Sequence, residues 1–289
     1  MSSPKDREGQ LAAARRWGRQ GLQRLLAREL ELVRAVPFQD AGHGYDLFGL
    51  EPEHVALLLA LLGQLHRHYF RVRSYGVENL PAKGSAILAS NHSGTLPFDA
   101  TMLWVDVIVR RGRIPRAVAD YFVAGLPFVG TLFARCGMVG GTAGNLRALL
   151  ESGEVVMIFP EGVPGVSKPF SRRYQLQEWR VGHAELALRH RVPVVPVAII
   201  GAEEQMPQLG LIQALGPLLG VPHVPLPLTP FPLPVRYHIH YGEPLVLHEG
   251  HRPEDADDPE VVQRAAWRVR DAVQALLEQG LRQRRGIFR

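Results

Sequence analysis

Uninterrupted apolar runs are the clearest feature of the chain, and they predict buried β-strands. These runs occupy residues 86–89, 155–159 and 194–200. Short runs rich in Val and Ile are typical of strands covered on both faces. Shorter or alternating runs predict three further strands, at residues 70–75, 116–119 and 235–241.

The segments between these strands carry the spacing of helices. Helices are expected at residues 99–111, 145–151, 178–190 and 259–280. Strands that alternate with helices in this way predict an α/β fold. We expect a mixed, largely parallel sheet flanked by helices, preceded by an N-terminal helical region.

The N-terminal region, residues 1–70, is expected to be helical, and residues 71–289 to form the α/β domain. If residues 10–36 form a helix, Trp17 and several leucines lie near one face of it and arginines occupy the rest of its surface. Such a helix either lies on an anionic membrane or packs on its own domain with the arginines in solvent. Residues 55–62, in a second helix predicted over 52–69, are apolar all round. This helix is too short to cross a bilayer, so it is expected in a protein core or at a lipid interface.

Composition and charge limit the classes of protein to which the chain can belong. The chain has 289 residues, 46% of them hydrophobic, enough for a sizeable core. Its single cysteine, Cys136, excludes a disulfide within the chain. The net charge of +5 favours anionic partners, but basic and aromatic residues do not interleave, so nucleic acid ranks last. The charged N-terminus has no apolar signal core, and no stretch reaches the ~20 apolar residues of a membrane span. We therefore expect a cytoplasmic protein.

A polar stretch, residues 91–99, follows the strand at 86–89 and is the first candidate site. Ligands of α/β proteins bind at such strand ends. It contains His92 and Asp99. A histidine oriented by a carboxylate is the minimum for general-base chemistry. The alternative is a turn held by its own hydrogen bonds.

Three further blocks follow in order, and together they carry a family resemblance. They are residues 130–135, the sequence Phe159-Pro160-Glu161-Gly162, and residues 192–197. With the His92 stretch, they resemble the glycerolipid acyltransferases, the superfamily of glycerol-3-phosphate and 1-acylglycerol-3-phosphate acyltransferases. The second block is one residue tighter than the common pattern. Six residues, rather than the usual four, separate His92 from Asp99, as in a less characterised bacterial branch.

The resemblance implies acyl transfer from a thioester, either acyl-CoA or acyl carrier protein, to a hydroxyl of a lysophospholipid or related glycerolipid. His92 is then the general base and Asp99 its partner. Arg135 matches the arginine that contacts phosphate, and the block Phe159-Pro160-Glu161-Gly162 matches a substrate-binding block. No cofactor is implied. The protein is expected to act peripherally at the inner face of an anionic membrane.

Several alternatives stay open at this stage. Lys168, with Arg172 and Arg173, either adds positive charge at the site or belongs to a solvated basic loop. The pair His238 and His240 lacks an evident third ligand, so no metal is expected. The chain could also be a retired acyltransferase fold that binds a membrane surface or a partner.

Two segments give more specific expectations. In the first block, Pro97 occupies the usual place of the aspartate, and Gly94 permits a wider turn that returns Asp99 to the imidazole. We expect a carboxylate oxygen within ~2.6–3.2 Å of a ring nitrogen. The alternative is that a backbone carbonyl holds the imidazole and Asp99 serves only as a helix cap. Residues 216–234 combine seven prolines with Leu, Val and Phe. Proline at this density excludes a helix or central strand. The segment is expected to dock on the core, with contact to lipid as the alternative, while Glu203 and Glu204 are expected in a solvated loop.

Overall fold

The structure is a computed structural model that describes residues 26–289 except 121–122, 124, 127 and 217–223. Helix is present at residues 26–34, inside the predicted basic helix. The rest of that prediction, including Trp17 and its arginines, lies outside the described residues.

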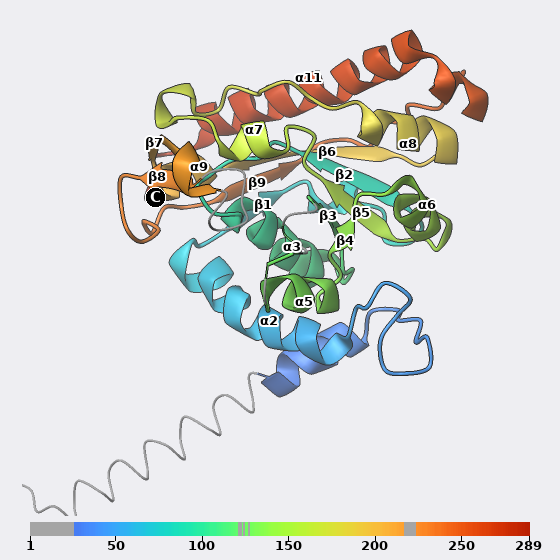
Figure 1. The fold of residues 1–289 in the computed structure, drawn as a ribbon, viewed down its shortest axis with the longest axis horizontal. Helices are drawn as coiled ribbons and strands as arrows, with labels where there is room; N and C mark the ends of the chain where they lie inside the picture. The colour runs from blue at the N-terminus through green and yellow to red at the C-terminus, as the bar shows by residue number, and fades with distance from the viewer. Residues whose placement is uncertain (1–25, 121–122, 124, 127, 217–223) are drawn as a thin grey trace, which may run out of the picture.

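A seven-stranded sheet forms the centre of the molecule (Figure 1). Its order is β1-β9-β6-β2-β5-β3-β4. The strands are β1 (Arg73–Tyr75), β2 (Ala86–Ser90), β3 (Arg116–Ala119), β4 (Val139–Gly140), β5 (Val155–Ile158), β6 (Val194–Ile200) and β9 (His238–Tyr241). Five of them, from β6 to β4, are parallel, and β9 pairs antiparallel with β6 and parallel with β1. The expected mixed, largely parallel sheet is confirmed.

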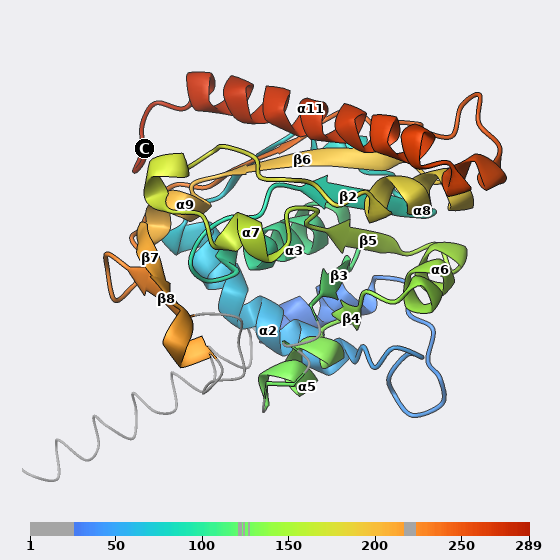
Figure 2. The same cartoon turned by 45° about the horizontal axis from the view of Figure 1, so that its top comes forward.

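Helices cover both faces of this sheet, as Figure 2 shows. Helices α2 (Pro52–Gln64), α3 (Phe98–Arg111) and α5 (Val129–Arg135) lie on one side. Helices α8 (Gly182–His190) and α11 (Pro259–Gln283) lie on the other. Helix α6 (Ala143–Glu151) packs on β5 and α8. The right-handed crossovers typical of parallel strands place helices on both faces in this way.

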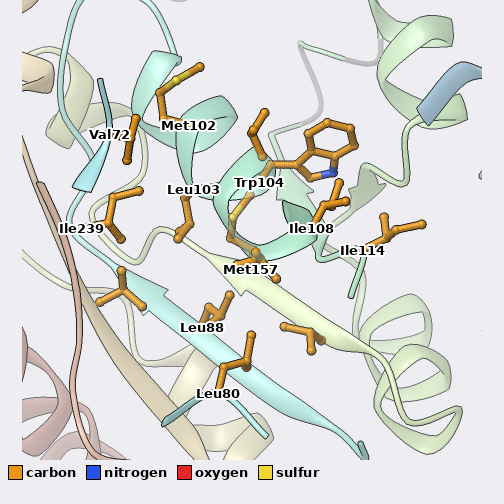
Figure 3. Close-up of a cluster of buried hydrophobic side chains, with 14 of the residues drawn as sticks. Val72, Leu80, Leu88, Met102, Leu103, Trp104, Ile108, Ile114, Met157 and Ile239 are labelled. Carbon is orange, nitrogen blue, oxygen red and sulfur yellow. The ribbon is translucent and has the colours of Figure 1, made fainter. Parts of the chain in front are cut away.

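The alternation of side chains in β2 divides the core into two clusters. Leu88 points to the α3 side, whereas Ile87 and Ala89 point to the α8 and α11 side, and all three are fully buried. Figure 3 shows the first cluster, in which Met102, Leu103 and other residues of α3 pack on strand residues such as Leu88 and Met157. The central strands β2, β5 and β6 are therefore covered on both faces, as the apolar runs predicted.

Several predicted elements differ in extent from those observed. Helix α8 begins at Gly182, four residues later than the predicted helix, and the N-terminal strand β1 is shorter than expected. The second helix continues as a π-helix over Leu65–Tyr69. Its centre was expected in a protein core or at a lipid interface: Val55 and Leu59 are buried in the core, whereas Leu57 and Leu61 are exposed, and contact of these two with lipid stays a prediction.

A second, two-stranded sheet lies beside the short helix α9 (Ala202–Gln205). It pairs β7 (Gln208–Ile212) with β8 (Val224–Pro227), in antiparallel orientation. Gly216, at the start of the proline-rich segment, is helical, against the prediction. Over residues 224–234 the segment forms β8 and irregular structure, with neither helix nor central strand, as predicted. Its docking on the core was wrong for the exposed Leu226, Leu228 and Phe231.

Candidate active site

The candidate site lies where the parallel strands β2 and β5 end. His92 comes two residues after Ser90, the last residue of β2, and Glu161 comes three residues after Ile158, the last of β5. Because these strands are neighbours and parallel, the two residues following them meet at one edge of the sheet. The backbone N–H of His92 donates to Glu161 Oε1 at 2.9 Å.

His92 and Asp99 form the predicted pair. The ring nitrogen Nδ1 of His92 lies 2.7 Å from Asp99 Oδ2, so the expected distance is confirmed. Asp99 is fully buried and also accepts the backbone N–H groups of Ser93 and Ala100. A carboxylate with these donors can only accept from Nδ1, which leaves Nε2 as the basic nitrogen of a neutral ring. In the described part of the chain nothing bonds to Nε2, and the side chain is 16% exposed.

The turn between the two residues explains how a separation of six residues still gives a pair. Gly94 has φ +94°, a conformation that residues with a Cβ rarely adopt. A Cβ there would also lie 2.8 Å from the carbonyl oxygen of Ala202. Pro97 then precedes α3, and Asp99 sits in its first turn, where the helix dipole favours a carboxylate.

Glu161 holds the backbone around the imidazole. Its second oxygen, Oε2, accepts the backbone N–H of Gln177 at 2.6 Å. The ring of Phe159 lies 4.4 Å, centroid to centroid, from that of His92. Gly165 approaches so closely that a Cβ there would lie 2.7 Å from the carbonyl oxygen of His92. The block Phe159-Pro160-Glu161-Gly162 thus forms one wall of the site.

Lys168 is buried and its charge is balanced by two carboxylates. Its Nζ lies 2.8 Å from Glu203 Oε1 and 3.7 Å from Glu161 Oε2. Burial raises the pKa of the Glu203 carboxyl, and the ion pair with Lys168 opposes that rise. The structure therefore brings Lys168 to the wall of the site but not into solvent. Arg172 and Arg173, which the sequence grouped with it, are exposed.

Glu203 and Glu204 are the clearest residues that sequence reasoning placed wrongly. Both are buried in α9 rather than in a solvated loop. Glu203 accepts the N–H of Tyr174 and pairs with Lys168, and Glu204 pairs with Arg284 through both of its oxygens. Their position directly after the buried strand β6 was the available signal.

Arg135 lies in a different cluster. Its Nε is 3.7 Å from Glu51 Oε2, and its guanidinium lies 4.6 Å from the centre of the Tyr45 ring. The predicted contact with phosphate stays a prediction. A cation that the sequence analysis missed lies nearer the predicted binding block: a Cβ on Gly162 would be 3.5 Å from Cζ of the exposed Arg180.

Cys136 has no catalytic geometry. The thiol is buried, and burial raises its pKa to about 12, so it is not a thiolate at neutral pH. Among the described residues no group of three or more His, Cys, Asp or Glu side chains could hold a metal ion.

Comparison with known proteins identifies the family. The family model named Acyltransferase matches residues 71–200, which include both members of the His92–Asp99 pair and the Glu161 block. The chain belongs to the acyltransferase family.

Two relatives and one solved structure show what this chain is similar to. The uncharacterized protein Rv0502 of Mycobacterium tuberculosis is 38% identical over 258 residues, which cover 85% of this chain and 72% of that protein. A Homo sapiens protein named DGAT1/2-independent enzyme synthesizing storage lipids is 26% identical over 208 residues, 71% of this chain and 60% of that protein. The 1-acyl-sn-glycerophosphate (LPA) acyltransferase PlsC from Thermotoga maritima has a TM-score of 0.50 at 18% identity, covering 81% of this chain and 83% of that chain. At that identity the likeness shows a shared fold.

In the part of the chain that is described, no helix is both long and apolar enough to cross a membrane.

Proposed function

We propose that this protein transfers a fatty acyl group from an acyl thioester, acyl-CoA or acyl carrier protein, to a hydroxyl of a lysophospholipid or related glycerolipid. The observation that carries the proposal is the 2.7 Å contact between His92 Nδ1 and Asp99 Oδ2, at the strand ends where the His92 stretch meets the Glu161 block. The names of the human relative and of PlsC support a lipid substrate.

The chemistry follows from the free ring nitrogen. Nε2 of His92 takes the proton of the acceptor hydroxyl while its oxygen attacks the thioester carbonyl carbon. The resulting tetrahedral intermediate collapses, the C–S bond breaks, and the imidazolium returns its proton to the departing thiolate. Buried Asp99 stabilises the transient imidazolium by its charge. This sequence needs no covalent enzyme intermediate.

Two arginines are candidates to bind a phosphate on the acceptor, one beside the Glu161 block and one in a different cluster. The resemblance assigns that role to Arg135, and the exposed guanidinium of Arg180 beside Gly162 supports a second candidate. A guanidinium binds phosphate oxygens in a bidentate manner. The intact pair and its buried supports argue against a retired fold.

The test is an assay with a radiolabelled acyl group, carried on acyl-CoA and in parallel on acyl carrier protein, against a panel of lysophospholipids and simple alcohols. The wild-type protein is expected to label a lysophospholipid, and His92→Ala to lose roughly 10²–10⁴-fold of that turnover. Circular dichroism checks that the variant is folded. Near wild-type turnover by folded His92→Ala, or no labelled lipid from wild type with either donor, would reject the proposal.

A further inference from the structure

The two-stranded sheet β7–β8 exposes an unusual amount of apolar surface. Five large side chains on or next to it are exposed: Leu209 59%, Leu211 37%, Leu226 46%, Leu228 61% and Phe231 77%. The two strands lie at one end of the molecule, beside α9, in both views (Figures 1 and 2). Exposed apolar side chains gathered on one element in this way indicate a contact site for another molecule or a membrane.

The exposed leucines lie on both faces of this ribbon. Leu226 is opposite Gly210, and Leu211 is opposite Pro225. Residues opposite one another share a face, and successive residues alternate, so Leu211 and Leu226 point to opposite faces. A flat protein surface covers only one face of a ribbon, whereas insertion into an apolar medium covers both.

The prolines of β8 suit such a medium. Pro225 and Pro227 have no backbone N–H, so this strand presents fewer donors that would need a partner in hydrocarbon. The same absence opposes the addition of a strand from another protein, because that mode of binding needs a row of free donors.

Positive charge borders the apolar surface. Arg71 donates to the carbonyl oxygen of Pro234, close in sequence to Phe231. Arg73 lies near Arg236, since the Arg73 N–H donates to the carbonyl oxygen of Tyr237, the next residue. The pKa of Arg236 is lowered by burial and then by the charges of Arg73 and Arg71. Among the described residues, none of the three forms an ion pair with a carboxylate. Unpaired arginines beside an apolar ribbon complement the headgroups of an anionic bilayer.

The ribbon also begins at the wall of the candidate site. Thr95, in the turn between His92 and Asp99, donates from Oγ1 to the carbonyl oxygen of Met206 at 3.0 Å. Gln208, the first residue of β7, donates from Nε2 to the carbonyl oxygen of Ser167 at 2.8 Å. A bilayer that covers the ribbon therefore lies against the edge of the site.

We propose that the β7–β8 ribbon and Phe231 insert into the interface of an anionic phospholipid bilayer, with Arg71, Arg73 and Arg236 against the lipid phosphates. The proposal rests on the proposed function for one step, the delivery of a lipid acceptor to the site edge. Membrane contact is measured without any acyl donor. A failure of membrane insertion can therefore be distinguished from a failure of the proposed acyl transfer.

The test is flotation of the full chain with vesicles of phosphatidylcholine and phosphatidylglycerol. Leu226→Ser/Leu228→Ser is expected to lower the partition coefficient at least about tenfold, since burial of one leucine side chain is worth that much or more. Arg73→Gln/Arg236→Gln is expected to lower it by about fivefold per arginine on these vesicles. On phosphatidylcholine alone, the arginine variant should match wild type.

The matched control changes two exposed apolar residues at the other end of the strands. Leu47, beside the Asp46–Arg116 ion pair at the start of β3, is 87% exposed, and Val109, in the last turn of α3, is 36% exposed. Leu47→Ser/Val109→Ser should bind vesicles as wild type does. Wild-type binding by Leu226→Ser/Leu228→Ser, or equal losses in the control, would overturn the proposal.

A second readout reports insertion directly. Leu228→Cys carries an environment-sensitive dye, and the buried Cys136 thiol, with its pKa near 12, does not compete for the label. The dye emission should shift to shorter wavelength with anionic vesicles, whereas dye on Leu47→Cys should not shift. No shift at residue 228 would overturn the proposal. The proposal would also be overturned if light scattering without lipid showed a dimer that Leu226→Ser/Leu228→Ser dissociates. The ribbon would then be an interface between two copies of the chain.

Discussion

Asp99 carries three roles at the scale of a single residue. It accepts from the His92 ring, from the Ser93 N–H that follows that histidine, and from Ala100 in its own helix. Loss of the carboxylate therefore disturbs both the imidazole and the start of α3. A second buried aspartate on the same helix separates these effects, because Asp106 accepts from His66, Ser74 and Tyr241 and has no contact with His92 among the described residues.

Asp99→Asn is expected to reduce turnover roughly 10²–10⁴-fold, because the neutral amide cannot stabilise the imidazolium or fix its tautomer. Asp106→Asn should cost comparable stability, about 1–3 kcal/mol for a buried group left with imperfect partners, and keep most of the turnover. Steady-state kinetics and urea unfolding on both variants measure the two quantities. Equal loss of turnover in both variants would show that Asp99 acts only on the stability of α3.

At the scale of elements, Glu161 joins the end of β5 to two other segments. It accepts the N–H of His92 from the end of β2 and the N–H of Gln177 from the extended segment before α8. A carboxylate can accept both bonds, whereas an amide has only one oxygen. Glu161 is thus a positioning residue for the backbone of His92.

We expect Glu161→Gln to lower kcat about tenfold to a hundredfold, since a shift of about 1 Å in a reacting group has an effect of this size. The KM for the acyl donor should change less. Glu203→Gln is the control: Glu203 pairs with the same Lys168 and accepts the Tyr174 N–H, but among the described contacts none joins it directly to His92. It should lower the unfolding midpoint in urea and leave kcat within a few fold. A kcat loss in Glu203→Gln as large as in Glu161→Gln would place the effect in the buried ion pairs as a whole.

The elements differ in how far the sequence could predict them. The run at residues 194–200 gave the bounds of β6 correctly, because a strand covered on both faces must be apolar at every position. Helix α8 begins late because Gln177 and Arg180 donate their N–H groups to Glu161 and to Pro160, which are remote in sequence and invisible to a helical pattern. The pair His92–Asp99 was predictable from local turn chemistry. The burial of Glu203 and Glu204 was not, because their countercharges, Lys168 and Arg284, come from distant segments.

At the scale of the whole molecule, the last helix reaches back to the site wall. Arg284, just after α11, binds Glu204 through two bonds and lies over the Tyr174 ring. The Tyr174 hydroxyl accepts the N–H of Gly201, and the Tyr174 N–H donates to Glu203. Arg284 therefore ties the end of α11 to α9 and to the segment before α8.

Buried neutral histidines predict how the stability of the fold depends on pH. Burial lowers the pKa of His183, on α8, to about 4, against an ordinary value of 6.5. Its Nδ1 donates to the carbonyl oxygen of Arg180, its Nε2 is buried without a partner among the described residues, and its ring packs edge-on to Trp179. His238, stacked near Tyr75, has its pKa lowered to about 4, by burial first and then by the charges around it, which include His240 and Arg236.

The direction in which stability changes with pH follows from how many protons the folded and unfolded chains bind. Between pH 6.5 and 4 the unfolded chain holds more protons on these histidines than the folded chain, so stability falls as the pH falls through this window. Above pH 6.5 these histidines are neutral in both states, so their contribution to the free energy of unfolding is fully present. For His183 alone the loss is of order 3 kcal/mol on reaching pH 4. Urea unfolding midpoints at pH 7 and pH 5 are expected to show the decline.

His183→Phe keeps a ring against Trp179 and removes the titration, so it should flatten the decline between pH 7 and pH 5 even if it lowers stability at pH 7. His68→Gln, which changes an exposed histidine, is the control and should keep the wild-type slope. The comparison is of slopes rather than of absolute stabilities, because the phenylalanine loses the hydrogen bond to Arg180 at every pH. An unchanged slope in His183→Phe would show that this histidine is not held neutral in the fold, and the acid sensitivity would then lie elsewhere.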